Sequence, residues 1–222
     1  MKKRLVYLTA HLVLLSSILL VSATQALAYP SFEASYRVTS NQYSLAPSAT
    51  IQHQLTYDQG EVTSHMNASV RLARWEETST FYAENGQLEA GNFDMYTRVI
   101  LRRRNYELAT EDFDQELPAY DRQSAIFYMA TAIHDMEPDQ IQSIMLVDER
   151  GLADELVIDL AGFTEMEGLK VAEVYFWKTK KPAEYTQAYL AIDYPGLLVF
   201  AQVHGSKGEK LLTFQLLDWE RL

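Results

Sequence analysis

Residues 51–72 read IQHQLTYDQGEVTSHMNASVRL, and the alternation within this stretch decides the fold class. Between residues 51 and 57 the side chains Ile, His, Leu and Tyr are separated by Gln, Gln and Thr. Residues 61–72 repeat the alternation, and Asp58-Gln59-Gly60 has the composition of a turn. Because successive side chains of a strand point to opposite faces, a period of two indicates strands. The stretch therefore predicts an antiparallel hairpin with one apolar and one solvated face.

Strand-like segments continue on both sides of this hairpin. They are expected at residues 32–39, 93–106, 152–160, 169–178, 185–193, 197–204 and 211–219. Val, Tyr, Phe, Trp and Leu dominate these segments, as β-strands favour. Clusters of Gly, Pro, Asn, Asp, Lys and Ser separate most of them, whereas residues 93–106 are predicted as one strand. Strands at this spacing predict an antiparallel meander, sandwich or open barrel.

Residues 124–136 (SAIFYMATAIHDM) break the alternation, because they are apolar on nearly all sides and rich in Ala and Met. Asp121 stands before them as a helix cap, and Pro138 marks their end. The sequence thus predicts a mainly β fold, in which a single antiparallel curled sheet or open β-barrel wraps one α-helix at about 124–136. No linker-like composition divides residues 29–222, so they are expected to form a single domain.

The amino terminus has the three parts of a secretory signal peptide. Lys2, Lys3 and Arg4 are its basic region, residues 5–21 are its apolar region, and Ala26-Leu27-Ala28 is a cleavage motif. An uncleaved membrane anchor is the alternative, but His and Ser side chains interrupt the apolar run, which falls short of the ~20 residues that span a bilayer. We therefore expect cleavage after residue 28, export to the periplasm, and no transmembrane anchor in the mature chain.

Composition narrows the classes of partner. Without residues 1–28 the chain carries 16 Lys and Arg against 30 Asp and Glu, a formal charge of −14. This charge repels nucleic acid and anionic head groups at long range, so nucleic-acid binding is not expected. The chain has no cysteine, which leaves packing alone to stabilise the exported protein. Thiolate catalysis, zinc–thiolate sites and a lipid-modified cysteine are excluded with it.

Asp112, Asp114 and Glu116 alternate within an acidic stretch and could supply oxygen ligands to calcium. The calcium-loop template fails at Leu117, which occupies the position of a required glycine. A solvated acidic loop, neutralised by the arginines of residues 102–104, is the interpretation that we prefer. No metal site is predicted.

The other groups of polar residues do not indicate a metal site or a catalytic site either. The histidines share no metal-ligand spacing, and His53 lies on the apolar side of its strand, where a core histidine is the default. Glu165 and Glu167 could act as a carboxylate pair in glycoside cleavage, but with 30 acidic residues chance pairs are common. No nucleophile motif is present. We therefore predict no catalytic residues, no cofactor and no enzymatic activity, with a carboxylate-based hydrolase as a remote alternative.

Several segments resemble an exported bacterial family known as domain of unknown function 3108. They are Phe32–Tyr36 (FEASY), Glu77–Gly86 with Phe93–Tyr96, Asp121–Tyr128, Val147–Leu160 and Tyr189–Val203. Two departures are a tyrosine at 189, where the family has tryptophan, and Ala90-Gly91-Asn92, which lacks the usual proline. The resemblance implies a β-rich periplasmic protein without established function and carries no catalytic residues over.

Two non-catalytic functions remain open. Strands at residues 171–177 and 197–200 are apolar on both faces, so one face could line a groove beneath the helix. Candidate groove residues are Phe127, Tyr128, Met129, Tyr175, Trp177 and Phe200. A carrier of an apolar or lipid-like ligand would need such a groove, and this is the function that we favour. If the helix fills the concavity, an envelope scaffold that binds a partner protein is the alternative.

Overall fold

One sheet of thirteen strands runs through the part of the chain that this computed structural model describes, residues 29–41, 48–70, 73–84, 86–100 and 102–222. The strands are β1 (Phe32–Ser40), β2 (Ser48–Asp58), β3 (Glu61–Val70), β4 (Ala73–Glu84), β5 (Gln87–Val99), β6 (Arg102–Leu108), β7 (Ala119–Tyr120), β8 (Ile141–Val147), β9 (Ala153–Met166), β10 (Leu169–Lys178), β11 (Tyr185–Ala191), β12 (Leu198–His204) and β13 (Lys210–Arg221). The expected signal peptide lies outside the described residues.

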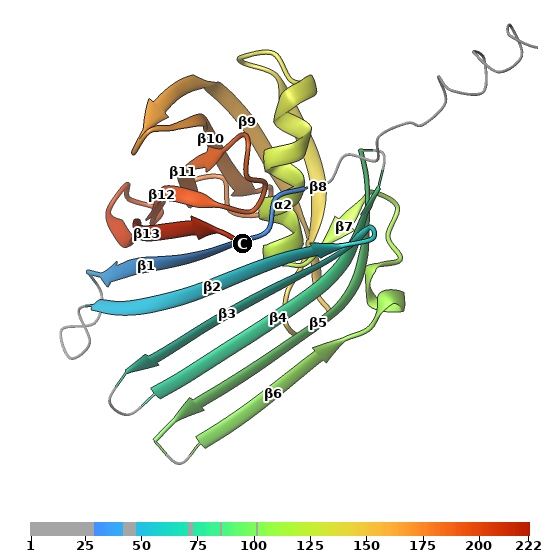
Figure 1. Cartoon of the computed structure of the whole chain (residues 1–222), viewed down its shortest axis with the longest axis vertical. Coiled ribbons are helices and arrows are strands. Elements are labelled where there is room, and N and C mark those ends of the chain that lie inside the picture. Colours follow the sequence, from blue (N-terminus) through green and yellow to red (C-terminus); the bar gives the residue numbers. More distant parts are fainter. Residues whose placement is uncertain (1–28, 42–47, 71–72, 85, 101) are drawn as a thin grey trace, which may run out of the picture.

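The strand order is β6-β5-β4-β3-β2-β1-β13-β12-β11-β10-β9-β8-β7. Most neighbours follow one another in the chain, and the pairing of β1 with β13 joins the two halves. The sheet curls around the helix without closing, since β6 and β7 remain its two edges (Figure 1). The predicted mainly β, curled antiparallel sheet is confirmed, with the single exception that β7 pairs with β8 in parallel.

The described residues contain one α-helix, α2 (Arg122–Ala132), followed by a 3-10 turn, η2 (Ile133–Asp135). A further 3-10 turn, η1 (Thr110–Phe113), follows β6. Asp121 caps α2, because its Oδ1 accepts hydrogen bonds from the backbone N–H groups of Gln123 (2.8 Å) and Ser124 (3.2 Å). The predicted helix and cap are confirmed, although α2 begins two residues earlier than expected and is replaced by the 3-10 turn η2 after Ala132.

The predicted single strand over residues 93–106 is wrong, because the chain reverses within it. β5 ends at Val99, a turn passes through Ile100, and β6 pairs back so that Arg98 faces Arg103. Ile100 has a φ of 56°, a conformation that favours Gly, Asn or Asp over a β-branched residue. No residue of those types marks the turn. The sequence therefore carries no composition signal for this hairpin.

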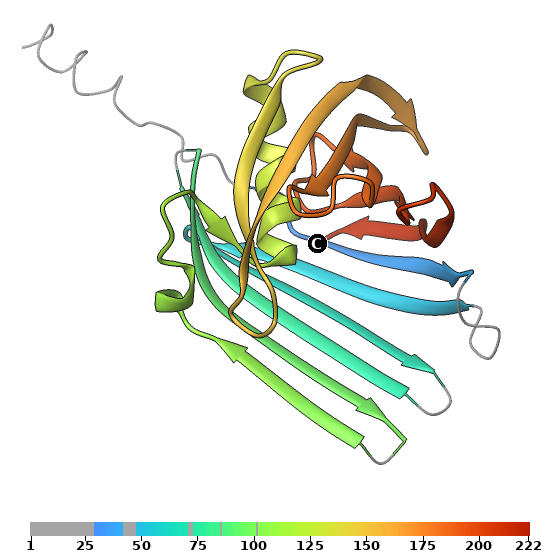
Figure 2. The ribbon, with the colours of Figure 1, turned by 180° about the vertical axis from the view of Figure 1, so that it is seen from behind.

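Three groups of buried side chains form the core. One group packs α2 against β8–β12, and the second packs Phe127 of α2 against β1–β4 and β10–β13. The third group draws the two ends of the sheet together through side chains. It comprises Phe93, Met95, Leu108, Phe113, Ala119 and Val147, from β5, β6, η1, β7 and β8. Seen from behind, β8 and β9 cross over the helix toward the side of the sheet that β5 and β6 form (Figure 2).

Candidate functional site

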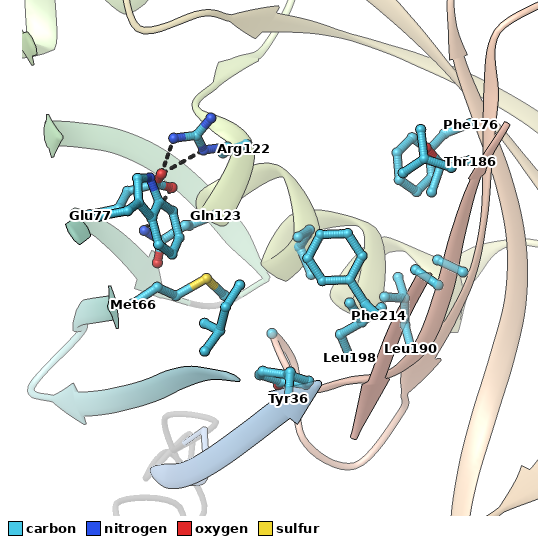
Figure 3. Close-up of a pocket in the computed structure, with 17 residues that line it drawn as sticks. Tyr36, Met66, Glu77, Arg122, Gln123, Phe176, Thr186, Leu190, Leu198 and Phe214 are labelled. Carbon is cyan, nitrogen blue, oxygen red and sulfur yellow. Dashed lines mark hydrogen bonds and ion pairs between the residues drawn. The ribbon is translucent and has the colours of Figure 1, made fainter. Parts of the chain in front are cut away.

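A cavity of about 380 Å³ lies between the concave face of the sheet and the first turns of α2 (Figure 3). This volume falls within the ~300–1,000 Å³ of typical small-molecule sites. Its lining comes from both halves of the sheet and is mostly apolar. The lining residues are Tyr36, Ile51, Met66, Trp75, Glu77, Arg122, Gln123, Ile126, Phe176, Thr186, Ala188, Gly196, Leu190, Leu198, Ala201, Val203 and Phe214.

Small side chains on the central strands leave the space open. Ala188 of β11 faces Ala201 of β12, and Ala201 in turn faces Phe214 of β13. Both alanines are buried and point toward the helix side of the sheet. Residues of leucine or phenylalanine size at these two positions would fill the concavity, so the two alanines keep the cavity open.

The polar end of the cavity is built around the carboxylate of Glu77, whose side chain is only 1% exposed. Gln123 Nε2 donates to Glu77 Oε1 (2.9 Å), and Arg122 Nε donates to Glu77 Oε2 (2.6 Å). A second donor of Arg122, Nη2, also contacts Oε2. The guanidinium lies over the rings of Trp75 and Phe93, 5.8 and 5.7 Å from their centroids. The three polar residues Glu77, Arg122 and Gln123 are called the polar cluster below.

Burial and charge act against each other in the polar cluster. Burial raises the pKa of Glu77, and the hydrogen bonds and charge of Arg122 oppose that rise. Burial lowers the pKa of Arg122, but the hydrogen bond and charge of Glu77 outweigh it and leave the pKa raised. The pair is therefore an ion pair with one buried member and one partly exposed member, since 44% of the Arg122 side chain is accessible.

A buried hydrogen-bond chain supports the polar cluster from behind. The hydroxyl of Ser64 donates to Gln123 Oε1, so it must accept from His53 Nε2, 2.8 Å away. His53 Nδ1 is then the acceptor that faces the Tyr36 hydroxyl at 3.4 Å. This pattern assigns a neutral histidine with its hydrogen on Nε2. Burial lowers the pKa of His53 to about 3, in agreement with the neutral form.

The expected groove residues on the helix lie outside this cavity. Phe127 is fully buried and packs edge-on against Phe81, with ring centroids 5.1 Å apart. Met129 belongs to the core between α2 and the second half of the sheet. Tyr128 stacks on Tyr120, with ring centroids 4.8 Å apart. The helical period brings Arg122, Gln123 and Ile126 to the cavity in their place.

The expected groove residues on the strands lie outside it too, because they alternate with residues that do line it. On β10, Phe176 lines the cavity, and its neighbours Tyr175 and Trp177 point to the other face. Phe200 of β12 likewise precedes Ala201 and packs near Tyr189, with ring centroids 6.2 Å apart. Both faces of these strands are apolar, so the alternation alone could not tell which face is concave.

The sequence reasoning missed the polar cluster. One signal was available, because Glu77 shares its face of β4 with Trp75, Ser79 and Phe81, a register in which a lone carboxylate is unusual. Within the described residues no group of three His, Asp or Glu side chains could hold a metal ion. In that same part of the chain no helix has the length and apolarity to cross a membrane.

No family model and no curated protein matches the chain. Among solved structures it is similar to MucB of Pseudomonas aeruginosa in complex with MucA (TM-score 0.41, 14% identity, 86% of this chain and 51% of that chain). The chain thus spans about half the length of MucB. It is also similar to a DUF1329 family protein from Desulfovibrio piger (TM-score 0.32, 11% identity, 88% of this chain and 86% of that chain). A third is a putative outer membrane lipoprotein-sorting protein domain from Vibrio parahaemolyticus (TM-score 0.34, 7% identity, 88% and 86%).

These matches leave the resemblance to domain of unknown function 3108 untested, and it stays a prediction.

Proposed function

We propose that this protein is an exported, non-catalytic carrier that binds one small amphiphile in the cavity beneath α2. The single observation that carries the proposal is a cavity of about 380 Å³ with apolar walls and the polar cluster at one end. An amphiphile matches this division, with its hydrocarbon part among Leu190, Leu198 and Phe214 and its head group near Arg122. The periplasm is the compartment that the predicted signal peptide implies.

The energetic argument rests on the cost of hydrocarbon in water. Each methylene that leaves water for an apolar wall contributes roughly 0.8 kcal/mol. A chain of several methylenes in the cavity would therefore bind even if the head group made no net contribution. The partly exposed Arg122 adds guanidinium donors that can meet an anionic or hydrogen-bonding head group.

Binding is favoured over hydrolysis because the buried carboxylates already have partners. The oxygens of Glu77 accept hydrogen bonds from Arg122 and Gln123. Those of Asp121 accept from the N–H groups at the start of α2 and from the hydroxyls of Ser79 and Ser124. These bonds give both carboxylates a structural role, Glu77 in holding Arg122 and Gln123 and Asp121 in capping α2.

The test is a chain-length series with octanoate, decanoate and dodecanoate as probes, measured by calorimetry on the purified protein. Affinity should rise about fifteenfold for each two added methylenes until the cavity is full. Ala188→Phe, which adds an aromatic ring to the wall of the cavity, should abolish the trend. Leu217→Phe, at an exposed position on β13, should leave it unchanged. Circular dichroism verifies that both variants are folded.

Native mass spectrometry of protein purified gently from the periplasm adds an independent measurement, in which a copurified lipid mass is expected. Equal affinity for octanoate and dodecanoate, or full affinity in Ala188→Phe, would contradict a ligand in this cavity. The envelope-scaffold function would then be the better explanation of the fold.

A further inference from the structure

The turn between β5 and β6 concentrates positive charge in an otherwise acidic chain. Arg98 is the second-last residue of β5, and Arg102, Arg103 and Arg104 begin β6. These four residues are a quarter of the 16 basic side chains that follow the predicted cleavage site, and they lie within seven positions. Together with Val99 and Ile100 they are called the arginine tip.

The strand register distributes the charges over both faces of the hairpin. Arg103 faces Arg98, which in turn faces Arg74 of β4, so these three lie in one row across three strands. Arg104 faces Thr97 on the opposite face, the face that carries the cavity residue Trp75. Charge on both faces suits a tip that enters a charged layer end-on better than a flat surface that binds one partner.

Few acidic groups neutralise the arginine tip. Glu76 forms an ion pair with Arg74, which is therefore not counted in the tip. The nearest carboxylates on these two strands are Asp94, four residues before Arg98, and Glu107, three residues after Arg104, at about 13 and 10 Å along the strands. Both spacings exceed the ~8 Å screening length at physiological salt. The positive potential of the tip consequently persists locally, although the whole chain is acidic.

The apolar residues at the turn are unusually exposed for their type. Val99 is 57% exposed and Ile100 is 58% exposed. Ile100 is also held at a positive φ, which strains a β-branched residue and which an exposed Asn or Gly would adopt without cost. An isoleucine at this position is unfavourable both for solvation and for backbone conformation. A role in contact with an apolar phase would account for it.

We propose that the arginine tip docks on the surface of an anionic phospholipid membrane, with the guanidinium groups on lipid phosphates and Val99 and Ile100 in the interfacial layer. Charge complementarity identifies the partner, since guanidinium binds phosphate with paired donors and basic clusters concentrate at anionic leaflets. The inference goes beyond the proposed carrier function and does not depend on it, because the tip lies outside the cavity lining.

The position of the tip is compatible with transfer between a membrane and the cavity. Strands β3–β6 extend away from α2, and the β5–β6 turn is at their far end (Figure 1). Trp75 is separated from Arg104 by a single strand, or about 10 Å at the spacing of neighbouring strands. A molecule leaving a membrane at the tip would therefore meet the concave face near the polar cluster.

The experiment measures flotation of the purified protein with two kinds of vesicle. One is phosphatidylcholine alone, and the other also contains about 30 mol% of the anionic lipid phosphatidylglycerol. Binding is expected only to the anionic vesicles and should weaken as salt rises. Removing three charges in Arg102→Gln/Arg103→Gln/Arg104→Gln should lower binding roughly a hundredfold. The control Lys178→Gln/Lys180→Gln/Lys181→Gln removes the same charge at the β10–β11 turn and should leave binding unchanged.

Ile100→Asn tests the apolar contribution without harming the fold, because asparagine tolerates the positive φ. It should weaken vesicle binding several-fold and leave the free energy of unfolding in urea unchanged or slightly higher. Equal flotation with neutral and anionic vesicles, or equal loss in the arginine and lysine variants, would overturn the proposal. Absence of flotation together with binding of an acidic peptide to β6 would overturn it in favour of a protein partner. Ala188→Phe should leave flotation intact, so failure of the carrier function and failure of docking can be distinguished.

Discussion

His53 provides the sharpest test of the buried polar network, because its protonation should destabilise the fold. The side chain is 3% exposed, its Nε2–H is used by Ser64, and its Nδ1 faces the Tyr36 hydroxyl. Burial lowers the pKa of His53 to about 3, against about 6.5 in an unfolded chain. Between these two values the unfolded state binds a proton that the folded state does not.

The sign and size of the effect follow from this difference. The stability that neutral His53 contributes is fully present above pH 6.5 and is lost as the pH falls toward 3. At pH 5.0, which is about 1.5 pH units below the unfolded pKa, the free energy of unfolding should be about 2 kcal/mol lower from this group alone. The raised pKa of Glu77 acts in the opposite direction, since the folded state then takes up the proton more readily.

The assay is urea unfolding, followed by tryptophan fluorescence at pH 8.0 and pH 5.0. His53→Gln keeps a polar side chain that does not titrate, and it should remove about 2 kcal/mol of the difference between the two pH values. His134→Gln changes an exposed histidine on η2, away from the buried network, and should preserve the wild-type difference. Glu77 is present in all three proteins, so its opposing contribution enters each measured difference. If His53→Gln and the wild type lose the same stability at pH 5.0, His53 is not a buried neutral histidine.

Three substitutions test other parts of the fold by urea unfolding. Asp121→Ala should cost about 1–2 kcal/mol through loss of the α2 cap, whereas Asp121→Asn, which keeps an acceptor, should cost less; equal costs would argue against the cap. Gly91→Ala should cost about 1–3 kcal/mol, because a Cβ there would lie 2.4 Å from the carbonyl oxygen of Thr80, and a neutral result would refute this close approach. Phe127→Ala should cost about 3–5 kcal/mol because Phe127 is a core residue. The control Phe163→Ala, at a 52% exposed position, should cost less than about 0.5 kcal/mol. A similarly small loss for Phe127→Ala would contradict its place in the core and favour the predicted groove position.

The sequence by itself determined the class of the fold and the cap of its helix. Alternation over residues 51–72 has one physical meaning, since only a strand turns successive side chains to opposite faces. Asp121 predicted α2 equally clearly, because an aspartate just before an apolar run can accept hydrogen bonds from the free N–H groups of the first helical turn. Both signals act between residues that are close in the chain.

Only the tertiary structure decided which face of the sheet is concave and what lines it. Tyr175 and Phe176 are both large and aromatic, so their order in the strand could not reveal that Phe176 faces the helix. The polar cluster joins β4 to α2 across 45 residues, a pairing that no local pattern encodes. The turn at Ile100 is similar, because its strained backbone is held by the strands on either side of it and not by its own residue type.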